Sequence, residues 1–220
     1  MTLTENAVGV LREEILSGFL KPGERVHLGT AAERLEMSPI PIREALRILA
    51  SEGLVQTLPQ RGYRVREASL EDLTDTYMVR KVVDPWAVEL AVPNLDEEDL
   101  QQLEQSHEEM MDRVAARDWI GSLPHHYAFH FGIYEKCGSP WLLRMVQILW
   151  ENGERYQRIE NVSIELKLKG AREHAGILEA CRRGEAAEAA ELTRKHLEGN
   201  ELGAKKLLLS IESAAEARTD

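Results

Sequence analysis

The first 68 residues change from a helical to a strand-like pattern of apolar positions. Apolar side chains recur every three or four residues in three successive segments, which predict helices over residues 6–17, 30–36 and 39–52. Ser38 is expected to be the N-cap of the third helix, because a serine hydroxyl there can accept from an unpaired helical N–H. Two short β-type runs follow, at residues 54–58 and 62–66. The pattern therefore predicts three helices and a hairpin.

Beyond residue 68 the pattern is helical throughout. The predicted helices cover residues 70–92, 97–117, 119–137, 140–160, 163–183 and 185–210, with Gly or Pro at most of the breaks. Six helices with short connections are typical of an antiparallel bundle. We thus expect a mainly α protein with two domains, three helices and a hairpin over residues 1–68 and an antiparallel helical bundle over residues 69–220.

The distribution of charge supports this division. The chain of 220 residues has 27 Lys or Arg and 38 Asp or Glu, a net charge of −11, so it does not bind nucleic acid through bulk positive charge. Residues 1–68 contain nine basic and nine acidic residues, which leaves 18 basic and 29 acidic residues beyond them. Such asymmetry between segments indicates two domains with different functions.

The remaining composition indicates an ordinary globular protein. No apolar run approaches the roughly 20 residues of a membrane span, and the N-terminus lacks a signal-peptide pattern, so we expect a cytoplasmic protein without a membrane partner. Cys137 and Cys181 are expected to be buried, reduced thiols. The four tryptophans are expected mainly in the core, with the ligand pocket or a dimer face as the alternative; they are Trp86, Trp119, Trp141 and Trp150.

Three helices followed by a hairpin with a basic tip suit insertion of the third helix into a DNA major groove. The run Pro41-Ile42-Arg43-Glu44-Ala45-Leu46, then Glu52-Gly53-Leu54-Val55, then Arg61-Gly62 resembles the winged helix-turn-helix of the GntR family of bacterial transcription regulators. This resemblance covers the first 68 residues. It implies contacts to double-stranded DNA from the start of the third helix and from the wing, and the expected DNA-binding residues are Ser38, Ile40, Arg43, Arg47, Arg61 and Gly62.

Arg43 is the best candidate to read a base, because a guanidinium can donate two hydrogen bonds to a guanine edge. The alternative is that Arg43 pairs with a neighbour such as Glu44 on a solvated helix face. Pro39 stands where the family usually has Arg directly after the serine, which implies a different operator or a lower affinity.

Four histidines lie on the apolar stripes of their predicted helices, and we expect them to point inward; they are His126, His130, His174 and His196. One interpretation is that they are hydrogen-bonded core residues, as we expect for His107. The other is a metal site, which bundles build from side chains of facing helices. Neutral imidazole suits transition metals far better than Mg or Ca.

Residues 70–210 resemble the all-helical FCD ligand-binding domain of the FadR-type branch of the same family. Many members of that branch have Asp-x-x-x-His, then His in a Glu-His run, then His near the last helix; here His126 stands in the Asp position. The resemblance implies that the four histidines bind a divalent transition metal, Zn or Ni first and Mn or Fe next, and that the metal holds a small carboxylic acid. The alternative is that His126 does not bind and the site is weaker.

Arg80 is the candidate second clamp for that acid. It lies on the stripe of Leu73, Tyr77 and Val83, so its guanidinium is expected to face the bundle interior, where an unpaired cation is costly. The ligand is one source of the required anion, and Asp84, one turn further along the helix, is the other.

Three functions compete at this stage. The first is a ligand-responsive regulator, a repressor in the form we favour, that binds a palindromic operator as a homodimer and senses a small carboxylic acid through the metal site. The second is a regulator in which metal alone is the signal. The third is a metal-dependent enzyme, which we disfavour because the chain has no HExxH.

Overall fold

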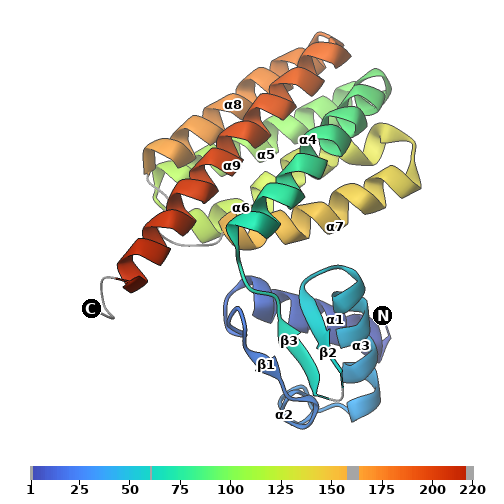
Figure 1. Cartoon of the computed structure of the whole chain (residues 1–220). Helices are drawn as coiled ribbons and strands as arrows, with labels where there is room; N and C mark the ends of the chain where they lie inside the picture. Colours follow the sequence, from blue (N-terminus) through green and yellow to red (C-terminus); the bar gives the residue numbers. More distant parts are fainter. Residues whose placement is uncertain (1, 60, 158–163, 217–220) are drawn as a thin grey trace. The chain divides into compact units, whose positions relative to one another are not determined.

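The computed structural model describes residues 2–59, 61–157 and 164–216. The chain folds into two compact units. One comprises residues 1–69 with 151–158, and the other comprises residues 70–150 with 159–220. The units are described separately below (Figure 1).

The N-terminal unit contains three helices and a small sheet. Its elements are α1 (Leu3–Leu16), β1 (Arg25–Val26), α2 (Leu28–Arg34), α3 (Pro39–Ser51), β2 (Val55–Leu58) and β3 (Gly62–Val65). The sheet is antiparallel in the order β1-β3-β2, so the predicted hairpin is present and gains a third strand that the sequence did not predict. A strand of two residues is too short to display an alternating pattern.

Local signals determine where the helices of this unit begin. The α1 helix starts three residues earlier than predicted, because Thr2 and Glu5 form a capping box in which each side chain accepts from the other's backbone N–H. Ser38 is the N-cap of α3 as predicted, but its side chain makes no capping hydrogen bond. The three helices pack around fully buried residues of α1 and α3, including Leu11, Ile42 and Leu46.

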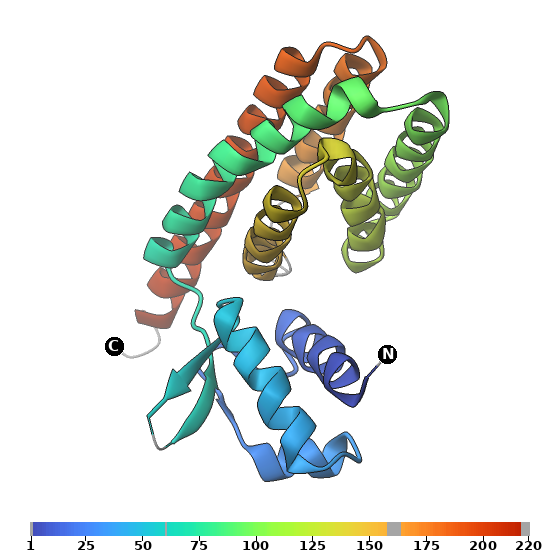
Figure 2. The same ribbon diagram turned by 90° about the vertical axis from the view of Figure 1, so that its right-hand side faces the viewer.

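The second unit is a bundle of helices (Figure 2). They are α4 (Leu70–Ala91), α5 (Glu97–Ala115), α6 (Trp119–Tyr134), α7 (Pro140–Gln157), α8 (Ile164–Arg182) and α9 (Ala186–Glu216), with short 3-10 turns η1 (Val92–Asn94) and η2 (Glu135–Cys137). The last turns of α7, from residue 151 on, are grouped with the N-terminal unit. All six predicted helices are present. The long α9 helix packs along α4 and α8, and α5 packs against α6 and α8. The predicted segments 158–160 and 163 lie outside the described residues.

The bundle core agrees with the sequence pattern except at the tryptophans. Cys137 and Cys181 are buried free thiols, as predicted, and burial raises the pKa of Cys181 to about 12. Trp150 is buried, but Trp86 and Trp141 are exposed, so the prediction that they belong to the core is wrong. Among the described residues, no helix is both long and apolar enough to cross a membrane.

Candidate metal centre and DNA-contacting face

Four imidazoles from three helices converge inside the bundle. The side chains come from α6 (His126 and His130), α8 (His174) and α9 (His196), and their candidate ligand nitrogens all lie within 4.8 Å of one another. Three of the rings are buried and His126 is half-buried. All four predicted residues are therefore brought together, and His107, hydrogen-bonded to the Ala171 carbonyl, lies outside the cluster.

The spacing of the nitrogens fits a transition metal. The Nε2 atoms of His130 and His174 face one another at 2.9 Å. A first-row metal binds imidazole nitrogen at about 2.0–2.1 Å, which separates neighbouring nitrogens by about 3.0–3.4 Å. The two rings thus need only a small displacement to share an ion. This donor set of nitrogens matches Zn, Ni, Cu or Fe(II) better than a hard cation.

Burial holds three of the four rings in the neutral form that binds metal. Burial, followed by the charges of His196 and Arg80, lowers the pKa of His126 to about 3, even though part of this ring remains accessible. Burial and the neighbouring imidazoles also lower the pKa values of His130 and His174 well below their usual range. Lone pairs are therefore available on these rings at neutral pH.

Three further residues contact the imidazoles, and the sequence did not single them out. Glu173 Oε2 lies 2.9 Å from His196 Nδ1, and the Asn200 side-chain nitrogen lies 2.9 Å from His196 Nε2. The Tyr134 hydroxyl lies 3.4 Å from His130 Nδ1. Tyr134 and Asn200 each follow their histidine by four residues, which is the signal that would have indicated contact along one helix.

Arg80 faces the bundle interior, as predicted, and is only 1 % exposed. Its Nε and Nη2 donate to Asp84 Oδ2 at 3.0 and 2.8 Å, so the expected alternative partner is present. Burial lowers the pKa of Arg80, but the charge of Asp84 with nearby Tyr77 and Tyr134 outweighs it and the net pKa is raised. Burial raises the pKa of Asp84 despite the opposing effect of Arg80.

The pair of Arg80 and Asp84 leaves two polar atoms for another group. Arg80 Nη1 and Asp84 Oδ1 are buried and have no hydrogen-bond partner within the described parts of the chain. Trp150 Nε1 is a third such atom, and the Arg80 guanidinium carbon lies 5.1 Å from the centre of the Trp150 ring. The same indole lies 5.0 and 5.1 Å from the rings of His126 and His130. These atoms thus border the imidazole cluster.

In the N-terminal unit, the start and outer face of α3 are exposed. Ser38, Ile40 and Arg43 are all accessible, and Arg43 has no ion pair or hydrogen bond among the described residues. The alternative expected for Arg43, an ion pair with Glu44, is not formed, because Glu44 pairs with Arg47 at 3.1 Å.

The wing presents the other predicted DNA contacts. Arg61 is exposed at the turn between β2 and β3, and Gly62 begins β3. Gly62 has a φ of +85°, a backbone conformation in which a side chain is strained. Its lack of a side chain therefore has a structural reason besides the predicted contact with DNA.

A winged helix-turn-helix joined in one chain to a bundle that encloses a polar cluster defines the class of DNA-binding regulators with a sensory domain. Residues 3–65 match the family described as bacterial regulatory proteins, gntR family, and residues 75–199 match the FCD domain. The chain belongs to the GntR family of transcription regulators, in its FadR-type branch.

Curated relatives agree along most of the chain. The HTH-type transcriptional repressor GlaR of Escherichia coli is 30% identical over 197 residues, which cover 85% of this chain and 89% of the relative. The HTH-type transcriptional regulator McbR of the same organism is 31% identical over 150 residues, 68% of each chain. The relatives are transcription regulators, and the chain is a regulator and not an enzyme.

Solved structures show the same fold. The structure of E. coli McbR/YncC has a TM-score of 0.85 at 24% identity and covers 94% of this chain and 99% of its own. A putative transcriptional regulator GntR from Rhodococcus sp. RHA1 has a TM-score of 0.75 at 24% identity, with 92% and 97% covered.

Proposed function

We propose that the chain is a ligand-responsive repressor that binds a palindromic operator as a homodimer in the cytoplasm and senses a small carboxylic acid through a metal bound by four histidines. The observation that carries this proposal is the convergence of the four imidazoles, three of them with lowered pKa values. Residues 1–68 are the proposed DNA-binding domain and residues 69–220 the sensory domain. The repressor name of the relative GlaR supports the sign of regulation.

The proposed ligands are His126, His130, His174 and His196, and Zn or Ni is the expected metal, with Mn or Fe next. Elemental analysis of untagged protein should find about one ion per chain. The His174→Ala variant should lose it, because His174 lies at the centre of the cluster, within 5.0 Å of the ring centres of the other three histidines. His125→Ala is the matched control, since His125 adjoins His126 but pairs with Glu109. Wild-type protein that stays metal-free after reconstitution with Zn and Ni would remove the metal site.

Arg80 is the proposed carboxylate clamp, because Nη1 is a buried donor without a partner in the described chain. An anion there would also lie beside the donor Trp150 Nε1. Operator binding should therefore be titrated with metal alone, with small carboxylic acids alone and with both. A response that needs both supports the acid sensor. A response to metal alone supports the alternative, a metal sensor with no organic effector.

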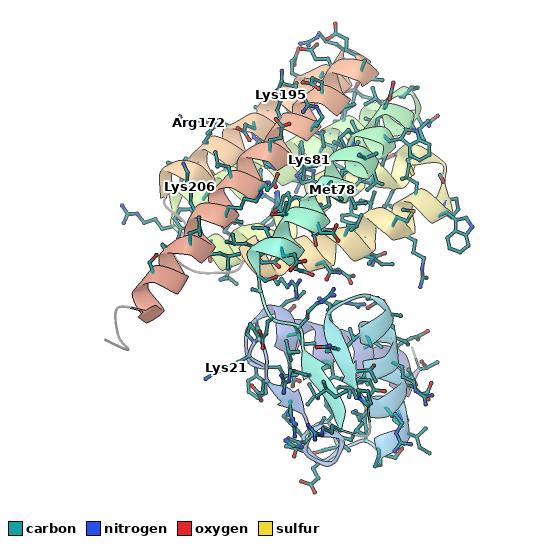
Figure 3. The ribbon with its side chains drawn as sticks, in the orientation of Figure 1. Lys21, Met78, Lys81, Arg172, Lys195 and Lys206 are labelled. Carbon is teal, nitrogen blue, oxygen red and sulfur yellow. The ribbon has the colours of Figure 1, made fainter. Side chains whose placement is uncertain are left out.

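Ser38, Ile40, Arg43, Arg47, Arg61 and Gly62 are the proposed DNA contacts. The exposed Arg43 should donate to a guanine, so Arg43→Ala should reduce operator affinity by about 1–3 kcal/mol and relax specificity. Arg172→Ala is the control, because Arg172 is an exposed arginine of α8 (Figure 3). Retained sequence preference in the Arg43 variant would refute the assignment of the recognition helix.

The proposed dimer uses an apolar stripe on α4. Met78, Val82, Trp86 and Leu90 recur every four residues and are all exposed, and Figure 3 labels Met78 on this helix. Such a row of large apolar side chains indicates a binding surface, and a second copy of the same helix is the partner that a two-fold palindrome requires. Val82→Glu should yield monomers in sedimentation analysis, whereas Glu89→Gln, on the same helix, should leave dimers.

A further inference from the structure

Both ring nitrogens of His196 are hydrogen-bonded to side chains outside the set of four histidines. Glu173 Oε2, from α8, lies 2.9 Å from Nδ1, and the Asn200 amide nitrogen, from the next turn of α9, lies 2.9 Å from Nε2. His196 itself is only 2 % exposed. By contrast, His174 Nδ1 is buried without a partner among the described residues.

The chemistry of the two partners fixes the tautomer of His196. A carboxylate accepts hydrogen bonds but does not donate them, so Nδ1 of His196 carries a proton and donates it to Glu173. The lone pair is then on Nε2, where it accepts from the Asn200 amide. Lys169 Nζ lies 3.7 Å from Oε1 of Glu173. The lysine thus pairs with one carboxylate oxygen, while the other, Oε2, contacts the His196 ring.

The two contacts have opposite consequences for a metal. The Glu173 contact orients the ring and makes Nε2 the more basic nitrogen, as carboxylate partners of metal-bound histidines do. The Asn200 contact occupies the same lone pair that a metal requires, so it must be broken before His196 can act as a ligand. One side chain therefore prepares the ligand and the other competes for it.

Resting on the proposed metal site, we propose that Glu173 and Asn200 are opposing positioning residues that set the metal affinity of His196. Glu173 directs Nε2 toward the cluster, and Asn200 holds that nitrogen until a metal replaces the amide. The affinity for metal is thereby tuned downward by Asn200, which keeps the site exchangeable. Neither residue belongs to the four proposed ligands.

Metal affinity of three variants tests this inference. Zn is titrated against a competing chelator with wild-type protein, Glu173→Gln, Asn200→Ala and the control Glu179→Gln, which replaces an exposed carboxylate of the same helix that pairs with Arg183. Glu173→Gln should weaken Zn binding about 10- to 100-fold. Asn200→Ala should strengthen it about three- to tenfold, because one neutral hydrogen bond no longer has to be broken. The control should change it less than twofold.

A second measurement separates this inference from the metal proposal. Nitrogen-15 NMR of metal-free wild-type protein should show the His196 proton on Nδ1, and Glu173→Gln should redistribute it between the two nitrogens. Circular dichroism confirms that each variant is folded. Wild-type protein without Zn affinity but with this tautomer would refute the metal proposal alone. An Asn200→Ala variant that binds Zn more weakly, a Glu173→Gln variant that binds it equally well, or a proton on Nε2 in the wild type would overturn the inference.

Discussion

Replacing Arg80 by methionine isolates the energetics of the buried pair. Arg80 and Asp84 are 1 % and 0 % exposed, and two hydrogen bonds of 2.8 and 3.0 Å join them. Methionine fills much of the same space but removes the charge and both donors, and it leaves a carboxylate without its counter-charge. A buried ion pair broken in this way costs about 3–5 kcal/mol of unfolding free energy. In the double variant Arg80→Met/Asp84→Leu no charge is stranded, so most of the stability should return.

The pH dependence of the stability lost in Arg80→Met provides a stricter test of this reasoning. Without Arg80, burial is opposed only by the weaker effects of Tyr134 and His196, so the folded pKa of Asp84 rises further above the unfolded value of about 3.9. The folded variant then takes up a proton before the unfolded chain does, so its stability deficit relative to wild type shrinks as pH falls. The change is at most about 1.4 kcal/mol per pH unit. Urea denaturation followed by circular dichroism at pH 7 and 5.5 measures both effects. A deficit that is independent of pH, or a double variant no more stable than Arg80→Met, would refute the reasoning.

Three further outcomes are expected. Metal-free protein should lose stability between pH 7 and 5, by at most about 4 kcal/mol, because the unfolded chain protonates His130 and His174 near pH 6.5 whereas their pKa values are lowered in the folded chain. Urea denaturation at both pH values measures this loss. The same pH dependence of stability in the double variant His130→Phe/His174→Leu would contradict the prediction. Ile40→Ala should weaken operator binding about tenfold and remove a preference for thymine, because an exposed isoleucine can contact the thymine methyl group. Gel-shift competition between operators with and without the thymine measures both effects. Thr2→Ala should cost about 1 kcal/mol by removing the α1 cap, and an unchanged melting curve would count against that role.

The fold could be predicted to a large extent because its signals are local. The helices of both units follow apolar spacing and Gly or Pro breaks, and several boundaries differ from the predictions by a few residues. Thr2 caps α1 earlier than predicted, α2 lies two residues earlier, and α9 continues to Glu216. The β1 strand was missed because its two residues pair with Arg64 and Tyr63, far along the chain. Long-range pairing of so short a segment leaves no periodic trace in the sequence.

The site was only partly predictable. Spacing indicated that each of the four histidines faces inward, but their meeting depends on the rotation and offset of three helices, and only the resemblance to a family supplied it. The carboxylate of Glu173 reaches across from α8 to α9, which no spacing along one helix encodes. The exposure of Trp86 and Trp141 was missed because a large apolar side chain reads the same on a core face and on a binding face.

The position of Trp150 makes it an intrinsic fluorescence probe of the histidine cluster. Its indole is buried, and the ring centre lies 5.0 Å from that of His126 and 5.1 Å from that of His130. The fluorescence emission of Trp150 should therefore respond to a ligand bound by these imidazoles. If the proposed metal binds there, a paramagnetic ion such as Ni or Cu would quench the Trp150 emission, whereas the closed-shell Zn ion would leave it bright. The Trp150 emission of the native chain would then distinguish between these metals without any label.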